Sequence, residues 1–131
     1  MEKESVKATS PLVLAYLGDA VYELEIRRGL VLRDHSRPAQ LSARASRLVC
    51  AAAQSKMVEA ILPQLSEEEE AVYRRGRNAH SPTMPKNQTV GDYRRATGFE
   101  ALIGYLYLAG ETERFRELIR IGLDALPKET L

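Results

Sequence analysis

The spacing of its apolar residues is the feature that most constrains how this chain can fold. Apolar side chains recur three and four positions apart along nearly all of the 131 residues, and no alternating β-branched runs lie between hairpin turns. Such spacing gathers the apolar side chains on one face of each helix. The sequence therefore predicts an all-α protein, and its length fits a single compact domain over residues 1–131.

Prolines, glycines and capping residues divide this pattern into helical stretches. Helices are expected over residues 11–32, from 36 towards 62, and over 66–78, 92–109 and 112–126. Ser66 and Glu69 have the spacing of a capping box, and the acidic run 67–70 suits the positive end of a helix dipole. A break near Gly98 stays open for the fourth helix. Residues 80–88 contain two prolines and predict an irregular connection.

Two apolar stretches each contain a single carboxylate, Asp19 within residues 11–22 and Glu100 within residues 97–109. A buried carboxylate without a partner is costly, so each of them could pair with an arginine or cap a neighbouring helix. If the two instead face each other, their oxygen atoms suit a hard divalent cation such as Mg²⁺. Glu23 lies one turn after Asp19, but its position four residues before Arg27 favours an ion pair.

Charged residues are unevenly distributed along the chain. The formal net charge is only +1, which by itself suggests no affinity for nucleic acid. Residues 67–73 nevertheless carry a net charge of −4, and residues 74–97 carry +5. The basic segment contains Arg74, Arg75, Arg77, Lys86, Arg94 and Arg95. Taken alone, it is either a solvated surface or a contact for an anionic partner.

The cysteine and the histidines fit no known catalytic or metal motif. Cys50 is the only cysteine, which excludes an intrachain disulfide and a cysteine-based zinc site, and we expect it to be a small buried hydrophobe. His35 and His80 have no partner at metal-ligand spacing. The apolar stretches are shorter than the roughly 20 residues of a membrane-spanning helix, and no secretory signal is visible. We therefore expect an unexported, cytoplasmic protein without membrane contact.

Two short segments surround the two carboxylates, residues 17–21 (LGDAV) and 99–104 (FEALIG). They are similar to the two signature segments of the ribonuclease III endonuclease domain, which is all-helical and works as a homodimer. Residues 15–23, 68–79, 85–87 and 93–107 are similar to Mini-ribonuclease III, the bacterial group of this family that lacks a separate double-stranded-RNA-binding domain. The resemblance covers essentially the whole chain and implies a homodimer of domains with about five to seven helices.

The resemblance implies that Asp19 and Glu100 are the catalytic and metal-binding acids, with Mg²⁺ as the cofactor and Mn²⁺ as a substitute. Larger ribonuclease III enzymes have two further acids, at positions that are Ala15 and Thr97 in this chain. This departure is typical of the mini group and leaves fewer protein ligands for the metal. We therefore expect a metal site that is weaker, or depends more on solvent, than in the four-acid relatives.

The resemblance also implies an RNA-binding role for the basic segment, because A-form duplexes are recognised through phosphates, 2′-hydroxyls and a shallow minor groove. The expected RNA-binding residues are Arg74, Arg75, Arg77, Asn78, His80, Lys86, Arg94 and Arg95. Arg37, Arg44 and Arg47 form either a second basic face or a solvated stripe. Tyr105 and Tyr107 are expected in the core, because both fall within a buried stripe, and not stacked on RNA.

The implied activity is metal-dependent hydrolysis of phosphodiester bonds in double-stranded RNA, leaving 5′-phosphate and 3′-hydroxyl ends. The mini group implies precursor large-subunit ribosomal RNA as the substrate, and assistance by a ribosomal protein stays open. One alternative is a non-catalytic double-stranded-RNA-binding homodimer of the same fold, which the retention of both Asp19 and Glu100 disfavours. A helical interaction protein that binds an acidic partner is a further alternative.

Overall fold

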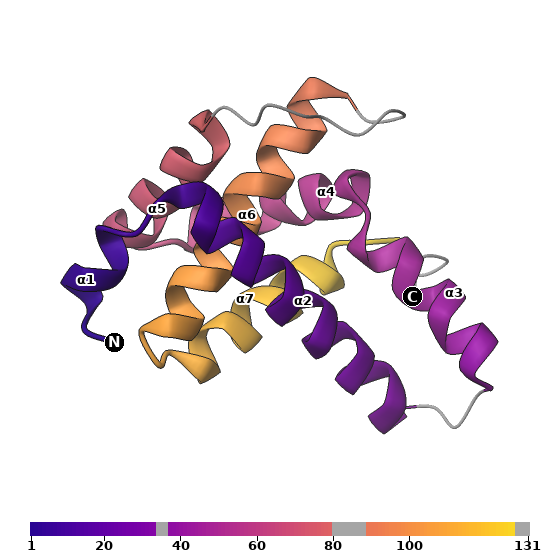
Figure 1. Ribbon diagram of the computed structural model, residues 1–131. Helices are drawn as coiled ribbons and strands as arrows, with labels where there is room; N and C mark the ends of the chain where they lie inside the picture. Colours follow the sequence, from indigo (N-terminus) through magenta and orange to yellow (C-terminus); the bar gives the residue numbers. More distant parts are fainter. Residues whose placement is uncertain (34–36, 80–88, 128–131) are drawn as a thin grey trace.

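The computed structural model describes residues 1–33, 37–79 and 89–127, and every regular element in these residues is helical (Figure 1). In chain order the elements are α1 (Lys3–Lys7), α2 (Pro11–Arg33), α3 (Pro38–Val49), α4 (Ala51–Ile61), a short 3-10 turn η1 (Leu62–Gln64), α5 (Glu67–Asn78), α6 (Val90–Leu108) and α7 (Thr112–Asp124). The prediction of an all-α fold is confirmed. Across the described ranges, no helix is long and apolar enough to cross a membrane.

Helix α6 forms the centre of the molecule. It packs against α2, α4, α5 and α7, and Figure 1 shows α2 crossing it. The side chains of Ala101, Leu102 and Ile103 in α6 are completely buried. Successive residues point in different directions around a helix, so α6 is enclosed on several sides at this level. This enclosure explains why the sequence of α6 is apolar apart from Glu100 over residues 97–109.

The capping box at the start of α5 is confirmed. The Ser66 hydroxyl accepts a hydrogen bond from the Glu69 backbone N–H at 3.2 Å, and the Glu69 carboxylate accepts one from the Ser66 backbone N–H at 2.9 Å. The Arg114 guanidinium of α7 donates two further bonds to this carboxylate, both at 2.8 Å. Its hydrogen bond and charge hold the pKa of Glu69 below the ordinary value. Glu69 thus caps α5 and also ties it to α7.

The expectation of one helix from residue 36 towards 62 is wrong, because the chain turns at Cys50. The extended backbone of this residue (φ −71°, ψ 156°) ends α3 and begins α4. Cys50 is also exposed and not buried as expected, because it lies at the corner between the two helices. Neither proline nor glycine marks this turn in the sequence. The turn allows α3 to pack on α2 while α4 packs on α6 and α7.

Two further features differ from the expectation. The short helix α1 was not expected, and α6 continues through Gly98 without a break. A Cβ atom at Gly98 would lie 2.8 Å from the carbonyl oxygen and the ring of Tyr73 in α5. This glycine therefore serves the close packing of α5 on α6. The other expected ends of α2, α5, α6 and α7 lie within two residues of the observed ones.

Candidate active site

The site begins at the crossing of α2 and α6, where two glycines let the helix backbones touch. A Cβ atom at Gly18 would lie 1.7 Å from the Glu100 carbonyl oxygen, and one at Gly104 would lie 2.1 Å from the Leu14 carbonyl oxygen. Only glycine fits at either position without moving a helix. Asp19 directly follows Gly18, and Glu100 precedes Gly104 by one turn. The close crossing therefore brings these two carboxylates together.

A pocket of about 270 Å³ lies beside this crossing. Its lining residues come from α2, from the corner between α3 and α4, and from α6: Asp19, Val49, Ala51, Gln54, Tyr93, Ala96, Thr97 and Glu100. Asp19 is exposed and Glu100 is half-buried. The two acids singled out in the sequence thus line one pocket that is open to solvent on the Asp19 side.

The surroundings of Glu100 change its protonation. Burial raises the pKa of Glu100 from its ordinary value of 4.5 to about 9, and a hydrogen bond with Asp19 and the charge of Asp19 act in the same direction. A hydrogen bond from the Gln54 side chain has the opposite, smaller effect on this pKa. Without a cation, the pair therefore keeps a proton on Glu100 at neutral pH. A cation between the carboxylates would act against this shift, because its positive charge favours the ionised form of Glu100.

The donor set of the pocket suits a hard divalent cation. Carboxylate and amide oxygens line it, and these are the ligands that Mg²⁺ and Mn²⁺ prefer. Over the residues that the structure describes, no group of three or more His, Cys, Asp or Glu side chains converges on one point. Ala15 is buried and carries no ligand atom, while the Thr97 hydroxyl donates to the Tyr93 carbonyl oxygen at 2.9 Å. Asp19 and Glu100 are therefore the acids available to a cation here.

Buried aromatic contacts hold the neighbourhood of Asp19 in place. Tyr22, one turn after Asp19, is completely buried, and its hydroxyl donates to the Leu48 carbonyl oxygen at 2.6 Å. Its ring meets that of Phe99 edge-on, with 5.2 Å between the centroids. Burial raises the pKa of Tyr22, which therefore stays neutral. The tyrosine joins α2 to the end of α3 and to the residue that precedes Glu100.

Comparison of the chain with known proteins identifies its family. A family model described as the Ribonuclease III domain matches residues 12–111. The chain belongs to the ribonuclease III family. Mini-ribonuclease 3 of Thermoanaerobacter sp. is 47% identical over 126 residues, which cover 96% of this chain and 89% of the relative. Mini-ribonuclease 3 of Enterococcus faecalis is 49% identical over 115 residues, which cover 86% and 87%.

A solved structure agrees with this assignment. The crystal structure of a protein from Fusobacterium nucleatum superimposes with a TM-score of 0.81 at 34% sequence identity. The matched region covers 91% of this chain and 95% of that protein. The helical architecture of this ribonuclease III family member is therefore shared by a protein whose structure was determined experimentally.

The end of α5 gathers several of the basic residues that the sequence singled out. Arg74, Arg75 and Asn78 line an open pocket together with Pro11, at the start of α2. Arg75 donates to the Lys7 carbonyl oxygen at 2.6 Å, whereas Arg74 lies 3.6 Å from the Glu70 carboxylate and is exposed. This part of the ribonuclease III fold presents a basic surface next to the amino terminus of a long helix.

Arg77 is held against its own helix. Its guanidinium lies 5.8 Å from the centre of the Tyr73 ring and donates to the Asn78 side-chain oxygen at 3.2 Å. The cation rests on the face of an aromatic ring, which limits its freedom. Arg77 and Asn78 therefore form a linked pair at the carboxyl end of α5.

The arginines of α6 differ in their surroundings. Arg94 is exposed. Arg95 donates to the Ser55 hydroxyl at 2.6 Å and pairs with Asp92 at 3.1 Å. Hydrogen bonds from Ser55 and Arg95 lower the pKa of Asp92, which stays ionised. Arg95 thus ties the start of α6 to α4, and Arg94 is the residue of this pair that is more open to a ligand.

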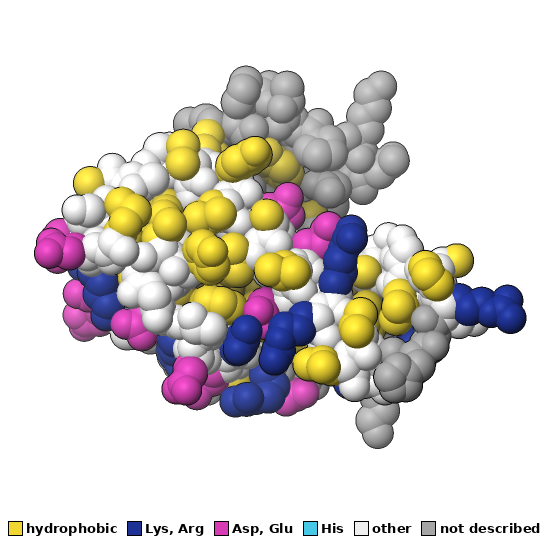
Figure 2. All heavy atoms as spheres, turned by 60° about the horizontal axis from the view of Figure 1, so that its bottom comes forward, with side chains coloured by type: hydrophobic (Ala, Val, Ile, Leu, Met, Phe, Trp, Pro, Cys, Tyr) yellow, Lys and Arg dark blue, Asp and Glu magenta, His cyan; other side chains and the backbone are white. Residues whose placement is uncertain are grey.

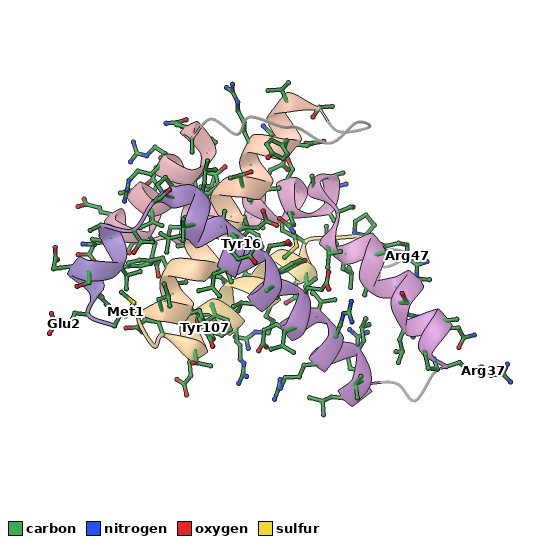
Figure 3. All side chains as sticks on the ribbon, viewed as in Figure 1. Met1, Glu2, Tyr16, Arg37, Arg47 and Tyr107 are labelled. Carbon is green, nitrogen blue, oxygen red and sulfur yellow. The ribbon has the colours of Figure 1, made fainter. Side chains whose placement is uncertain are left out.

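Several sequence-predicted residues lie away from the pocket or outside the described residues. His80 and Lys86 belong to the segment 80–88, which is outside the described residues. Arg37 and Arg47 are exposed at opposite ends of α3 (Figure 3). The predicted ion pair of Glu23 with Arg27 is confirmed, with 2.8 Å between nitrogen and oxygen. Glu23 is therefore occupied outside the pocket.

An apolar stripe runs along the solvent side of α2. Val13, Tyr16, Leu24 and Val31 are all more than half exposed, and Tyr16 reaches 84%. Their spacing places them on one face of the helix. Figure 2 shows hydrophobic side chains gathered on one face of the molecule with charged ones at its border, and Figure 3 shows Tyr16 on α2. This ribonuclease III family member thus exposes an extended apolar surface.

The two tyrosines near the end of α6 have different environments. Tyr105 is 2% exposed, which confirms the predicted core position. Tyr107 is 49% exposed, so the prediction of a core position for it is wrong. Its ring only tilts against Phe115, with 6.3 Å between the centroids, because α6 ends at Leu108 beyond the level of the core.

Sequence reasoning missed Gln54 as a residue of the pocket. Gln54 lies on α4 at helical spacing from Val58 and Ile61, which are both buried. A polar residue in such a stripe is a detectable signal, because the other positions of that stripe are apolar. The turn at Cys50, which directs this face of α4 to the pocket, was not expected.

Proposed function

We propose that this ribonuclease III family member is a Mg²⁺-dependent endoribonuclease that hydrolyses phosphodiester bonds in double-stranded RNA. The observation that carries the proposal is the meeting of Asp19 and Glu100 in one solvent-open pocket, with a pKa of about 9 at Glu100. Two carboxylates held together at this cost in free energy are typical of a site that binds a cation. The family of the chain supplies the reaction class.

Asp19 and Glu100 would hold the metal ion in this pocket. When bound, a divalent cation activates water for attack on the phosphodiester and stabilises the charge of the transition state. Glu100 would hold such an ion in its ionised form, and Asp19 would face the incoming RNA from the open side of the pocket. Ala15 and Thr97 offer no carboxylate, so further ligands would have to come from water and RNA phosphate. Mn²⁺ substitutes for Mg²⁺, because the same oxygen ligands suit both ions.

The basic residues of α5 and α6 would bind the duplex. Arg74 and Arg94 are exposed and have side chains long enough to follow an A-form backbone. We assign the same role to Arg75, Arg77, Asn78 and Arg95, and to His80 and Lys86 in the connecting segment. Arg95 also fixes the start of α6 through Ser55 and Asp92. Since its bonds are already made, we expect Arg95 to contribute less to phosphate binding than Arg94.

We infer that the enzyme is a homodimer with one site in each protomer. The stripe of Val13, Tyr16, Leu24 and Val31 on α2 supports this inference, because an extended apolar surface is typical of an interface. Two sites on opposite sides of a duplex would cut both strands and leave short 3′ overhangs. Each product would carry a 5′-phosphate and a 3′-hydroxyl.

The proposed substrate is precursor large-subunit ribosomal RNA in the cytoplasm. The support is the similarity of residues 15–23, 68–79 and 93–107 to the mini group. The domain over residues 1–131 would itself bind the substrate through its basic surface. A ribosomal protein bound to the same RNA would add contacts to those of this small basic surface.

Cleavage of matched nucleic acids tests the substrate class. The full chain is incubated with a double-stranded RNA, its single strands and a DNA duplex of equal sequence, each with Mg²⁺ or with EDTA. We expect cleavage of the RNA duplex with Mg²⁺ alone, and products with 5′-phosphate ends. Duplex binding without cleavage would indicate a non-catalytic RNA-binding protein, and cleavage in EDTA would exclude the metal-dependent reaction.

A further inference from the structure

Gln54 is a completely buried residue of the pocket whose amide group is only partly hydrogen-bonded. Its side chain is 1% exposed and lines the same pocket as Asp19 and Glu100. Nε2 donates to the Val49 carbonyl oxygen at 3.1 Å. Oε1 is buried and has no hydrogen-bond partner within the part of the chain that the structure describes. Buried polar atoms are paired in most proteins, so such an oxygen indicates a missing partner.

The turn at Cys50 fixes which way this amide points. Because α3 ends at Val49 and Cys50 is extended, the Val49 carbonyl oxygen accepts no hydrogen bond from a following turn of the same helix. It instead accepts the bond from Gln54 Nε2. Rotating the Gln54 amide by half a turn would place its Oε1 against the Val49 carbonyl oxygen. The geometry therefore requires Nε2 at Val49 and leaves Oε1 without a donor.

The same amide group also contacts one of the proposed metal ligands. Gln54 is hydrogen-bonded to the Glu100 carboxylate and lowers the pKa of that group. Nε2 carries two hydrogens, so it can donate to Val49 and to Glu100 together. Oε1 is then the one atom of the amide that needs a donor from outside the protein. The pocket offers space for that donor, since its volume of about 270 Å³ exceeds that of several water molecules.

We propose that Gln54 Oε1 belongs to the divalent-cation site, where it accepts a hydrogen bond from a water molecule in the hydration shell of the cation. The inference rests on the proposed function, because that function supplies the cation. Mg²⁺ keeps several waters when it binds to proteins, and groups that bind these waters increase the affinity. A neutral amide takes this role without adding a third negative charge beside Asp19 and Glu100. The Gln54 amide compensates in part for the missing carboxylates at positions 15 and 97, where this chain has Ala15 and Thr97.

Cation binding measured without RNA tests this inference. Calorimetric titration of the full chain with Mn²⁺ is compared between the wild type, Gln54→Met and Ser55→Ala. Methionine keeps the length of the side chain but offers no oxygen, so we expect binding about tenfold weaker. Ser55 is the next residue of α4 and is also buried, but its hydroxyl accepts a bond from Arg95. We expect Ser55→Ala to bind Mn²⁺ within about twofold of the wild type, because Ser55 does not line the pocket.

Two further variants make the result decisive. Gln54→Glu keeps an oxygen acceptor and loses the bond to the Val49 carbonyl oxygen, but its added negative charge attracts the cation, so we expect it to bind Mn²⁺ at least as tightly as the wild type. Affinity unchanged in Gln54→Met but lost in Asp19→Asn would overturn the role of Gln54 and leave the proposed function intact. Unchanged affinity in both variants would contradict the proposed function itself. If Gln54→Met loses helicity in circular dichroism, the decision falls to Gln54→Glu, and a loss of more than tenfold there overturns the inference.

Discussion

At the scale of single residues, the molecule places two acids where their negative charges would repel each other. Asp19 and Glu100 were predictable from the sequence, because each is the one carboxylate of an apolar stretch. Their meeting was predictable as one of the alternatives, the others being a pairing with arginine and the capping of a neighbouring helix. Gln54 was not predicted, because its place in the pocket depends on the turn at Cys50, which no proline or glycine marks.

Glu100 gives the free energy of unfolding a specific dependence on pH. Its pKa rises from 4.5 in the unfolded chain to about 9 in the folded one. Between about pH 4.5 and pH 9 the folded state therefore keeps a proton on Glu100 that the unfolded state has already lost. The stabilising effect of this proton is complete below the lower value and is lost as the pH passes through the upper one. Metal-free protein should consequently become less stable over this range.

The substitution Glu100→Gln should remove this dependence. Glutamine cannot ionise, and its amide can still form a hydrogen bond with Asp19. We expect the variant to be more stable than the wild type in EDTA at pH 8, by about 2 kcal/mol, and the difference to vanish near pH 4. Urea denaturation at several pH values measures the effect. A constant difference between the two proteins at every pH would contradict the perturbation of Glu100.

At the scale of the helices, glycine positions decide how the site is assembled. Helix ends were predicted within two residues at α2 and α5, because proline at the start of one and a capping box at the start of the other mark them locally. The division of the second predicted helix was not predicted, because tertiary packing determines it. The close crossing of α2 and α6 is also a tertiary property, although Gly18 and Gly104 make it possible.

The crossing predicts opposite effects for two glycine substitutions in α2. In Gly18→Ala the new methyl group meets the Glu100 backbone, with 1.7 Å to its carbonyl oxygen, so the helices must separate. We expect a loss of at least about 3 kcal/mol in the free energy of unfolding, together with loss of cleavage. Gly29→Ala is the control, because nothing lies within 4 Å of the new atom.

The control should be neutral or stabilising by up to about 1 kcal/mol, because alanine favours a helix over glycine. Urea denaturation and circular dichroism measure both variants. Equal stability of Gly18→Ala and Gly29→Ala would show that the helices cross at a greater distance than described here.

At the scale of the whole molecule, the net charge of +1 gives no sign of the basic surface on α5 and α6. The molecule also exposes an apolar surface on α2. The uneven charge was visible in the sequence, with −4 over residues 67–73 and +5 over residues 74–97. The apolar stripe of α2 was visible only as an apolar helix, because the sequence does not separate a buried face from an exposed one. A small basic surface predicts RNA binding of modest affinity that weakens as the salt concentration rises.

The exposed stripe predicts a self-association that a single charge should disrupt. Tyr16 is the most exposed residue of the stripe, at 84%, and Tyr16→Asp places an unpaired charge near the amino-terminal end of the stripe. We expect light scattering to give a dimer for the wild type and a monomer for the variant at micromolar concentration. Val90→Asp adds the same charge to an exposed residue of α6 outside the stripe and should stay dimeric. A wild-type monomer would contradict the dimer and the paired cuts.

The most direct test of the central claim is single-turnover cleavage of an RNA duplex at increasing Mg²⁺ concentrations by the wild type, Asp19→Asn and Glu100→Gln. Duplex binding is measured in parallel without Mg²⁺. We expect both variants to bind the duplex within about threefold of the wild type and to cleave it at least about a thousandfold more slowly. Cleavage at the wild-type rate by either variant would contradict the claim that Asp19 and Glu100 form the catalytic cation site.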